Sequence, residues 1–358
     1  MIHTVELIKV IHYADYYHLI QNTQYKGSDT VRYYDKMKDC GIKIALYEQK
    51  VGGMGNLKVQ LNFSKLKNAN EQVKLVKAAD LPRLIKEAEK LLYEAISDLN
   101  QSKKYLCLSN LKSFEKTSSI SLSDFKIHRV DYAVQLSGLS QAEIDAYIAI
   151  YNEGNLRKWN KSKTRYKTSC NKKNNSVKVN IYDKAAERKE HKADEWEINR
   201  AKGILRVEFQ CLEDKLYAMT KSKKFAEYNL SKDEPASFLN ADVSRCVIRD
   251  YLKEIGYQSE HITLNEARKR IQTSSYNQQK KDSLINLIKE ASKPRITLDK
   301  VKDNLYKDNT RLFASHIKDL ESLNINPIIL PRDGKITYLP NLLTLIEEQW
   351  KSDDKETK

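Results

Sequence analysis

The stretch SVKVNIYDKAAERKEH, residues 176–191, indicates the fold because its pattern changes in the middle. Val177, Val179 and Ile181 alternate with polar residues, as in a strand with one apolar face. After Tyr182 the sequence continues as a charged helix. A tyrosine in a strand usually packs as a half-buried ring, so Tyr182 alone indicates no function.

Three further segments have the same construction: LKVQLNF (57–63), HRVDYAVQL (128–136) and LRVEFQC (205–211). If the four strands share one sheet, helices cover its apolar face, and its polar face gathers Asp131, Glu208 and Tyr182 with several cations. The ordinary interpretation of such a face is a solvated surface with cross-strand ion pairs, for example between Arg129 and Glu208.

The remaining pattern predicts an α+β protein. Strands are expected at 4–11, 30–35, 42–49, 57–63, 126–136, 177–183 and 203–211, with the glycine-containing turn VGGMGN between the third and the fourth. Helices are expected at 82–99, 140–154, 235–255, 263–272, 275–291, 297–305 and 308–323, followed by a short strand in INPIILP. We therefore expect an antiparallel sheet with helices on one face in a domain of residues 1–215, a mostly helical domain at 216–350, and a disordered tail at 351–358.

The composition narrows the class of protein. A net charge of +15 over 358 residues favours a polyanionic partner, which inside a cell is usually nucleic acid. No apolar run reaches membrane-spanning length and the start, MIHTVELIKVIHY, lacks a signal-peptide pattern, so we expect an intracellular protein with no membrane partner. The five cysteines form no Cys-x-x-Cys pair and no phosphate-loop motif occurs, so a disulfide framework, a zinc knuckle and nucleotide hydrolysis are all unsupported.

The polar face of the expected sheet suggests metal-assisted chemistry on a phosphate. The carboxylates of Asp131 and Glu208 and the amide oxygen of Gln60 suit Mg²⁺ or Mn²⁺. Such a cation stabilises the negative charge that develops on a phosphate, and Tyr182 could then attack phosphorus and form a covalent intermediate. Lys184 could bind the phosphate or lower the pKa of the phenol.

A basic stretch precedes the tyrosine. LRKWNKSKTRYKTSCNKKNNSVK, residues 156–178, holds nine Lys or Arg and no acid. Such a run is usually a solvated loop, but aromatic rings interleaved with cations also suit single-stranded DNA, whose bases stack while the cations follow the phosphates. The residues expected to contact DNA, on this stretch and on the polar face, are Arg129, Trp159, Lys161, Lys163, Arg165, Tyr166, Lys167, Lys172, Lys173, Lys178, Asn180 and Arg206.

Three motifs in this order resemble those of rolling-circle replication initiators. VNIYDKAAERKEH is similar to their tyrosine motif, HRVDYAVQL to the Arg-Leu-Asp strand that precedes it, and ILRVEFQ to the Arg-x-Glu strand that follows it. The order and spacing are similar to those of staphylococcal rolling-circle plasmid initiators. The start MIHTVEL and the segment HIKDLESLNINPIILP resemble the filamentous-phage gene II replication protein family.

The resemblance implies a metal-dependent, site-specific DNA nickase of the bacterial cytoplasm. Tyr182 would attack the origin phosphodiester, keep the 5′ phosphate as a phosphotyrosyl intermediate and release a 3′-OH primer. Asp131 and Glu208 would hold or orient the metal, and Lys184 would hold the phosphate or assist the phenol. The implied partners are single-stranded or hairpin origin DNA and the host replicative helicase and DNA polymerase. A plasmid or a phage origin, and a homodimer, stay open.

The sequence departs from this family in several places. It has no His-hydrophobic-His pair, the feature that names HUH nickases. His128 is the nearest substitute, but strand parity places it opposite Asp131 unless a bulge intervenes, so we expect a buried, hydrogen-bonded histidine there; His191 is expected to be exposed. Gln60 stands where the plasmid initiators carry Glu. Tyr166 is the alternative nucleophile, although no strand fixes it.

The segment ITLDKVKDNLYKDNTRLFASHIKDLESLNI, residues 296–325, predicts two helices around a short polar turn. A helix-turn-helix could place Lys307, Arg311 and Lys318 on DNA. The apolar stripe of Leu312, Phe313, Ile317 and Leu320 is expected to be core. The rival functions are a non-catalytic DNA-binding replication or transcription regulator and an RNA-binding protein, and a covalent DNA adduct separates the nickase from both.

Overall fold

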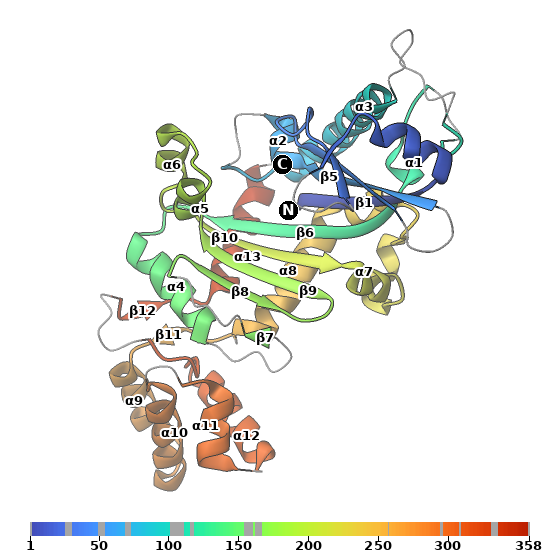
Figure 1. Cartoon of the computed structure of the whole chain (residues 1–358). Coiled ribbons are helices and arrows are strands. Elements are labelled where there is room, and N and C mark those ends of the chain that lie inside the picture. Colours follow the sequence, from blue (N-terminus) through green and yellow to red (C-terminus); the bar gives the residue numbers. More distant parts are fainter. Residues whose placement is uncertain are drawn as a thin grey trace. The chain divides into compact units, whose positions relative to one another are not determined.

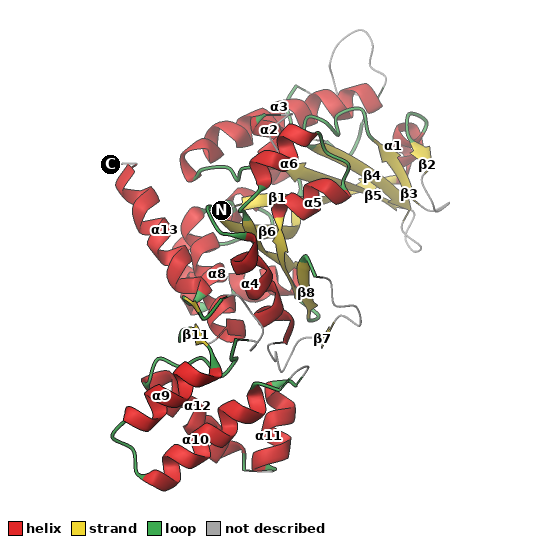
Figure 2. Cartoon of the chain, turned by 90° about the vertical axis from the view of Figure 1, so that its left-hand side faces the viewer, coloured by secondary structure: helices red, strands yellow, loops and turns green. Residues whose placement is uncertain are grey.

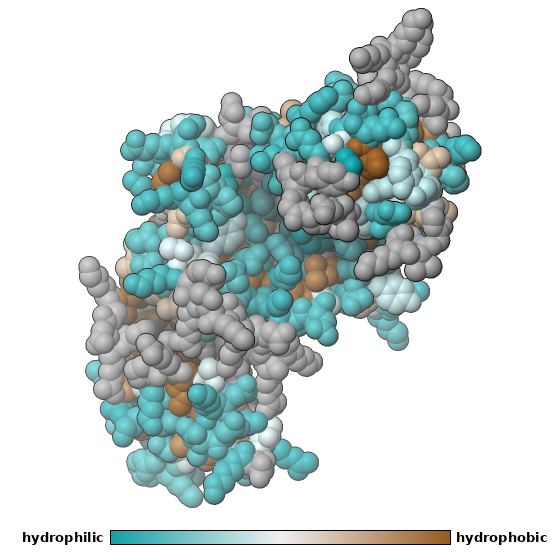
Figure 3. All heavy atoms as spheres, viewed as in Figure 1, coloured by the Kyte–Doolittle hydropathy of each residue, from teal (hydrophilic) through white to brown (hydrophobic). Residues whose placement is uncertain are grey.

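A computed structural model of the chain describes residues 2–25, 31–48, 54–68, 73–100, 111–114, 118–153, 160–161, 167–256, 258–293, 296–307, 309–330 and 336–356. It confirms the α+β class, and Figure 1 labels the helices and strands along the chain. Of the helices described, none has the length and hydropathy needed to cross a membrane. The face in Figure 3 is mainly hydrophilic, with apolar atoms in small groups.

The strands of the main sheet follow one another in the order β2-β3-β4-β5-β1-β6-β10-β9-β8-β7. Strand β1 pairs antiparallel with both β5 and β6. The four strands that the sequence groups by their shared alternation (β5, β6, β9 and β10) therefore do belong to one sheet. The strand bounds are β1 Ile2–His12, β2 Gln24–Tyr25, β3 Val31–Tyr34, β4 Ile42–Glu48, β5 Met54–Asn62, β6 Lys126–Leu136, β7 Asn160–Lys161, β8 Ser169–Lys173, β9 Val177–Asp183 and β10 Leu205–Leu212.

The chain divides into two compact units, each assembled from separate stretches of sequence. Unit 1 consists of Met1–Ala133, Asn175–Lys178 and Glu208–Val247, and unit 2 of Val134–Asn174, Val179–Val207 and Ile248–Lys358. The limits of the units fall inside strands β6, β9 and β10, so neither unit matches the expected domain boundary at residues 215/216.

Unit 1 contains helices on strands β1 to β5. Helices α2 and α3 lie over β4 and β5 (Figure 2). Pro82 stands in the first turn of α3, and the apolar face of this helix is buried at Leu84, Ala88, Leu92 and Ala95, as its period predicts. The helical segments of this unit are α1 Tyr13–Ile20, α2 Phe63–Lys67, η1 Ala78–Asp80, α3 Leu81–Leu99, η2 Leu122–Asp124, α7 Glu213–Thr220, η3 Lys223–Tyr228 and η4 Pro235–Phe238.

Unit 2 combines strands β8 and β9 with helices. Helices α9 to α12 pack together around a buried core that includes Leu284, Leu287, Val301 and Leu320 (Figures 1 and 2). The element bounds are α4 Gln141–Glu153, α5 Lys184–Glu190, α6 Glu195–Ala201, β11 His261–Ile262, α9 Leu264–Thr273, α10 Gln278–Ala291, α11 Leu298–Tyr306, α12 Thr310–Ser322, β12 Tyr338–Leu339 and α13 Leu342–Glu356; α8, Ala241–Gly256, crosses the limit between the units.

Three expectations for the fold are wrong. The segment INPIILP forms no strand within its described residues, and only Leu330 makes an isolated bridge, to Thr263. Residues 351–356, expected to be disordered, continue helix α13. Leu312, expected in the core of the helical region, is 43% exposed, whereas Ile317 and Leu320 of the same stripe are buried.

Candidate functional site

The local sequence fixes Tyr182 immediately before a helix of unit 2. Strand β9 ends at Asp183, whose Oδ1 accepts hydrogen bonds from the backbone N–H of Ala185 at 2.8 Å and of Ala186 at 3.3 Å. This is an N-cap, and it starts α5 at Lys184. The other carboxylate oxygen of Asp183 accepts from the Gln141 side chain at 3.0 Å. The strand end and the helix start are therefore locked together at the tyrosine.

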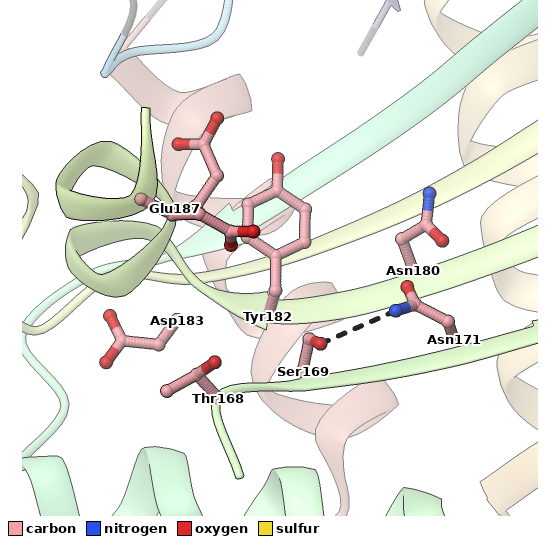
Figure 4. Close-up of a pocket in the computed structure, with 8 residues that line it drawn as sticks. Thr168, Ser169, Asn171, Asn180, Tyr182, Asp183 and Glu187 are labelled. Atoms are coloured by element: carbon pink, nitrogen blue, oxygen red, sulfur yellow. Dashed lines mark hydrogen bonds between the residues drawn. The ribbon is translucent and has the colours of Figure 1, made fainter. Parts of the chain in front are cut away.

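Tyr182 lines a pocket of about 220 Å³ in unit 2. The ring rises from β9 beside Glu187 of α5, and Asn180 lies farther along the same strand (Figure 4). The other lining residues are Thr168, Ser169, Asn171, Asp183 and Glu190. Hydroxyl, amide and carboxylate groups line the pocket, so it is polar, and Tyr182 supplies its phenol.

Lys184 places an amine beside this phenol. Its Nζ lies 5.8 Å from the centre of the Tyr182 ring and donates a hydrogen bond to Glu187 at 2.9 Å. Burial and the nearby charge of Arg206 lower the pKa of Lys184 to about 8, although Glu187 acts in the opposite direction. The amine can therefore lose its proton at mildly alkaline pH, as a general base requires.

Glu187 gathers the cations around it. Its carboxylate accepts from Arg188 at 2.8 and 2.7 Å as well as from Lys184, and His191 Nε2 lies 3.7 Å away. Burial favours the neutral acid, but these hydrogen bonds and charges outweigh it and lower the pKa of Glu187 to about 2. Glu187 raises the pKa of Lys184 in return, but the burial of Lys184 and the charges of Arg206 and Arg188 outweigh this effect.

A second cluster lies within unit 1 and contains three buried carboxylates. The side chains of Glu6, Asp131 and Glu208 are 9%, 3% and 7% exposed. Arg129 joins two of them, with Nη1 2.7 Å from Glu6 and with Nε and Nη2 2.8 and 3.0 Å from the two oxygens of Asp131. Lys58 Nζ lies 2.6 Å from Glu6. Arg129, expected to pair with Glu208, thus binds Glu6 and Asp131.

The strand register brings Glu6 into this cluster. Glu6 on β1 stands opposite Gln60 of β5 on one side and opposite Arg129 of β6 on the other. Sequence reasoning missed Glu6, although its position was readable, because Thr4 and Glu6 alternate with Val5 and Leu7. The third carboxylate therefore comes from Glu6 on the N-terminal strand. Gln60, which stands where a third carboxylate was expected, lies opposite it.

The three carboxylates are of the chemical type that a divalent cation prefers as ligands. Burial, above all, and the charges of Glu208 and Glu6 raise the pKa of Asp131 to about 7 against the opposing effect of Arg129. Crowded carboxylates of this sort are stabilised by a hard cation, for which oxygen donors are the preferred ligands. In the described part of the chain, however, no group of three or more His, Cys, Asp or Glu side chains has the arrangement of a metal site.

Two β-bulges interrupt the pairing of β1 with β6, and each has a histidine as its extra residue. The pairing of β1 with β6 shifts between Ile2 and Thr4 and again between Glu6 and Leu7, so His3 and His128 are the extra residues. His3 Nδ1 lies 3.5 Å from Glu208. The parity argument for His128 fails at its bulge, and the side chain is 34% exposed with Nδ1 3.5 Å from Glu213, so the expectation of a buried histidine is wrong. His191 is 65% exposed, as expected.

The residues expected to contact DNA have different environments. Lys167, Lys173 and Lys178 are exposed, and Asn180 lines the Tyr182 pocket. Trp159, Lys163, Arg165 and Tyr166 lie outside the described residues, and Lys161 lies in β7 with its side chain outside the description.

Two of these expected contacts are wrong because the side chains are buried. Arg206 is 0% exposed and donates a hydrogen bond to Gln135 at 2.9 Å, and Lys172 is 7% exposed. The side chains of Arg206 and Lys172 cannot reach a DNA strand on the surface. Arg129 is 18% exposed and pairs with Glu6 and Asp131, and its contact with DNA stays a prediction.

No protein-family model matches the chain, and no curated protein is significantly similar to it. The function is therefore inferred from the two clusters and the order of the three motifs.

Proposed function

We propose that this chain is a rolling-circle replication initiator that nicks one DNA strand with Tyr182. The observation that carries the proposal is the position of Tyr182 in a polar pocket beside Lys184, whose pKa is lowered to about 8. A phenol needs a base to become a nucleophile, and a buried amine that is partly neutral near physiological pH is such a base.

The reaction would proceed in one displacement. Lys184 accepts the phenolic proton, directly or through one water, and the Tyr182 oxygen forms a bond to phosphorus. The bond between phosphorus and the 3′ oxygen breaks, and that oxygen takes up a proton to become the 3′-OH primer. The 5′ phosphate stays on Tyr182, which conserves the energy of the phosphodiester for a later re-joining step.

Glu6, Asp131 and Glu208 would supply the oxygen ligands for Mg²⁺ or Mn²⁺, although Arg129 and Lys58 pair with two of them and the three do not have the arrangement of a metal site among the described residues. When bound, a divalent cation supplies positive charge that stabilises negative charge on a phosphate. Glu6 takes the role of third oxygen ligand that Gln60 has in the sequence-based prediction, because a buried carboxylate binds a cation more strongly than an amide does.

The partners follow from the products of the reaction. The substrate would be single-stranded or hairpin origin DNA, which the positive chain and the exposed Lys167, Lys173 and Lys178 would attract. The 3′-OH would be extended by a host DNA polymerase behind a replicative helicase, in the bacterial cytoplasm.

The test is the formation of a covalent protein–DNA adduct. Purified protein is incubated with single-stranded DNA of its own replicon and Mn²⁺ or Mg²⁺, and the products are separated on a denaturing gel. We expect an adduct that disappears in Tyr182→Phe and with a chelator but persists in Tyr166→Phe. Tyr217→Phe is the control, because this ring is 55% exposed and lies outside the pocket.

Each other result selects a rival. An adduct lost in Tyr166→Phe but kept in Tyr182→Phe would move the nucleophile to Tyr166. Tight DNA binding without an adduct under either metal would make the chain a DNA-binding regulator. Equal binding of RNA, unchanged in Tyr182→Phe, would make it an RNA-binding protein.

A further inference from the structure

A second pocket lies among the C-terminal helices of unit 2. Its volume is about 290 Å³, near the small end of the range of roughly 300–1,000 Å³ for ligand pockets. Ser283 and Asn286 reach it from α10, Tyr306 from α11, and Leu312 and His316 from α12. The proposed nicking reaction gives this pocket no role.

The polar groups that line the pocket are uncharged. The Tyr306 hydroxyl and His316 Nδ1 are 2.7 Å apart and buried. Burial lowers the pKa of His316, so the imidazole stays neutral at physiological pH, and Tyr306 fixes the role of one ring nitrogen. Asn286, an exposed residue on the rim, offers both a donor and an acceptor. A charged ligand would find no counter-ion among these groups, whereas a neutral one with donors and acceptors along its edge would be satisfied.

Apolar contacts complete the pocket. Leu312 is 43% exposed although it stands in an otherwise apolar helical stripe, and the Tyr306 ring packs edge-on against Phe313 with 5.3 Å between ring centres. A flat ring in this pocket can therefore contact the side chains of Leu305 and Leu312 while its edge meets Asn286. Nucleobases have this combination of an apolar face and a hydrogen-bonding edge, and Asn side chains pair with such edges in bidentate fashion.

The charges around the pocket favour a base that belongs to a strand. Residues 258–330 contain 13 Lys and Arg against 9 Asp and Glu. Lys307 and Arg311 are exposed and flank Asn309, which also lines the pocket, in the turn between α11 and α12. Although Asp308 also stands between them in the sequence, the two exposed cations can attract the phosphates next to a base held in the pocket.

We infer that this pocket holds one unpaired base of single-stranded DNA, between α10, α11 and α12. The choice of DNA as ligand rests on the proposed nicking function. The pocket would give the chain a base contact that is separate from the chemistry at Tyr182, and a preference for the base that fits it.

The experiment uses the full chain with Tyr182→Phe, so that binding is measured without covalent reaction. Short single strands carry the fluorescent adenine analogue 2-aminopurine at one central position with mixed bases around it. We expect its fluorescence to rise on binding, because the base leaves the stack. A further Asn286→Leu change should abolish the rise and weaken binding about tenfold.

Two further variants keep the result interpretable. Gln279→Leu makes the same kind of change on the exposed surface of α10 outside the pocket, and should leave fluorescence and affinity unchanged. Ser283→Ile fills the pocket and should act like Asn286→Leu, and circular dichroism checks that both variants fold. A fluorescence rise that survives both pocket variants, or binding with no rise at all, overturns the inference.

The adduct assay with unmodified Tyr182 separates this inference from the proposed function. An adduct without a pocket-dependent fluorescence rise leaves nicking in place and removes the base pocket. A pocket-dependent rise without an adduct keeps the base pocket and removes nicking.

Discussion

Replacing Glu187 with glutamine removes the negative charge that Lys184 and Arg188 share. The pKa of Glu187 is lowered from 4.5 to about 2, a difference that corresponds to roughly 3 kcal/mol of stability. A lowered carboxyl pKa stabilises the fold above the unfolded value, and the contribution is lost as the pH falls through the folded value. Glu187→Gln should therefore cost about 3 kcal/mol at pH 7, and the difference from the parent should shrink below pH ~4.5 and vanish near pH ~2.

The same substitution should change the pH dependence of the proposed reaction. Glu187 is one of the groups that raise the pKa of Lys184, so its loss should move that pKa below about 8. If Lys184 is the base for Tyr182, the midpoint of adduct formation against pH should fall by a similar amount. A purely structural role of Glu187 would lower the yield at every pH without moving the midpoint.

Urea unfolding at several pH values measures the stability, and the rate of adduct formation across pH measures the midpoint. Glu190→Gln is the matched control, because Glu190 is exposed on the same helix and lines the same pocket. The reasoning is refuted if Glu187→Gln and Glu190→Gln give the same midpoint, or if Glu187→Gln costs less than ~1 kcal/mol at pH 7.

Three further substitutions test other parts of the structure. Because the pKa of Asp131 is raised from 3.8 to about 7, the folded state holds this proton more tightly than the unfolded state does, and the free energy of unfolding falls as the pH rises across that range. Asp131→Asn should remove this fall, which urea unfolding at pH ~5 and ~8 measures. A Cβ on Gly55 would lie 2.6 Å from Tyr16, so Gly55→Ala should cost ~1–3 kcal/mol and lower the Tm. Leu320→Ala should cost ~2–5 kcal/mol, whereas Leu312→Ala should stay within ~0.5 kcal/mol in the same thermal unfolding experiment.

The sequence predicts the elements best where local signals are strong. Strands β6 and β9 match their expected ranges residue for residue, because apolar residues alternate along both. The helices after residue 260 are correct to within a few residues because capping side chains precede them: Thr263, Asn277, Thr297 and Asn309 each accept a hydrogen bond from the following turn.

Elements that depend on tertiary pairing are not predictable in this way. Strand β8 has the sequence SCNKK, in which Cys170 is the one hydrophobic residue, and its extended form comes from pairing within the sheet. Arg206 shows the same limit for single residues. Alternation along β10 places it on the polar face, but alternation does not say what covers that face, and Arg206 is fully buried.

A search for a single-strand histidine pair finds none in this sequence, and it would also miss histidines at bulges such as His3 and His128. Such a search assumes that residues i and i+2 of one strand share a face, which holds only where the ladder is regular. A bulge inserts one residue, and every assignment of faces beyond it is reversed. Here two neighbouring strands, β1 and β6, each contribute one bulged histidine, and each of these lies 3.5 Å from a carboxylate, Glu208 for His3 and Glu213 for His128. Histidines that lie beside carboxylates can therefore come from different strands, and the spacing of histidines in the sequence does not predict them.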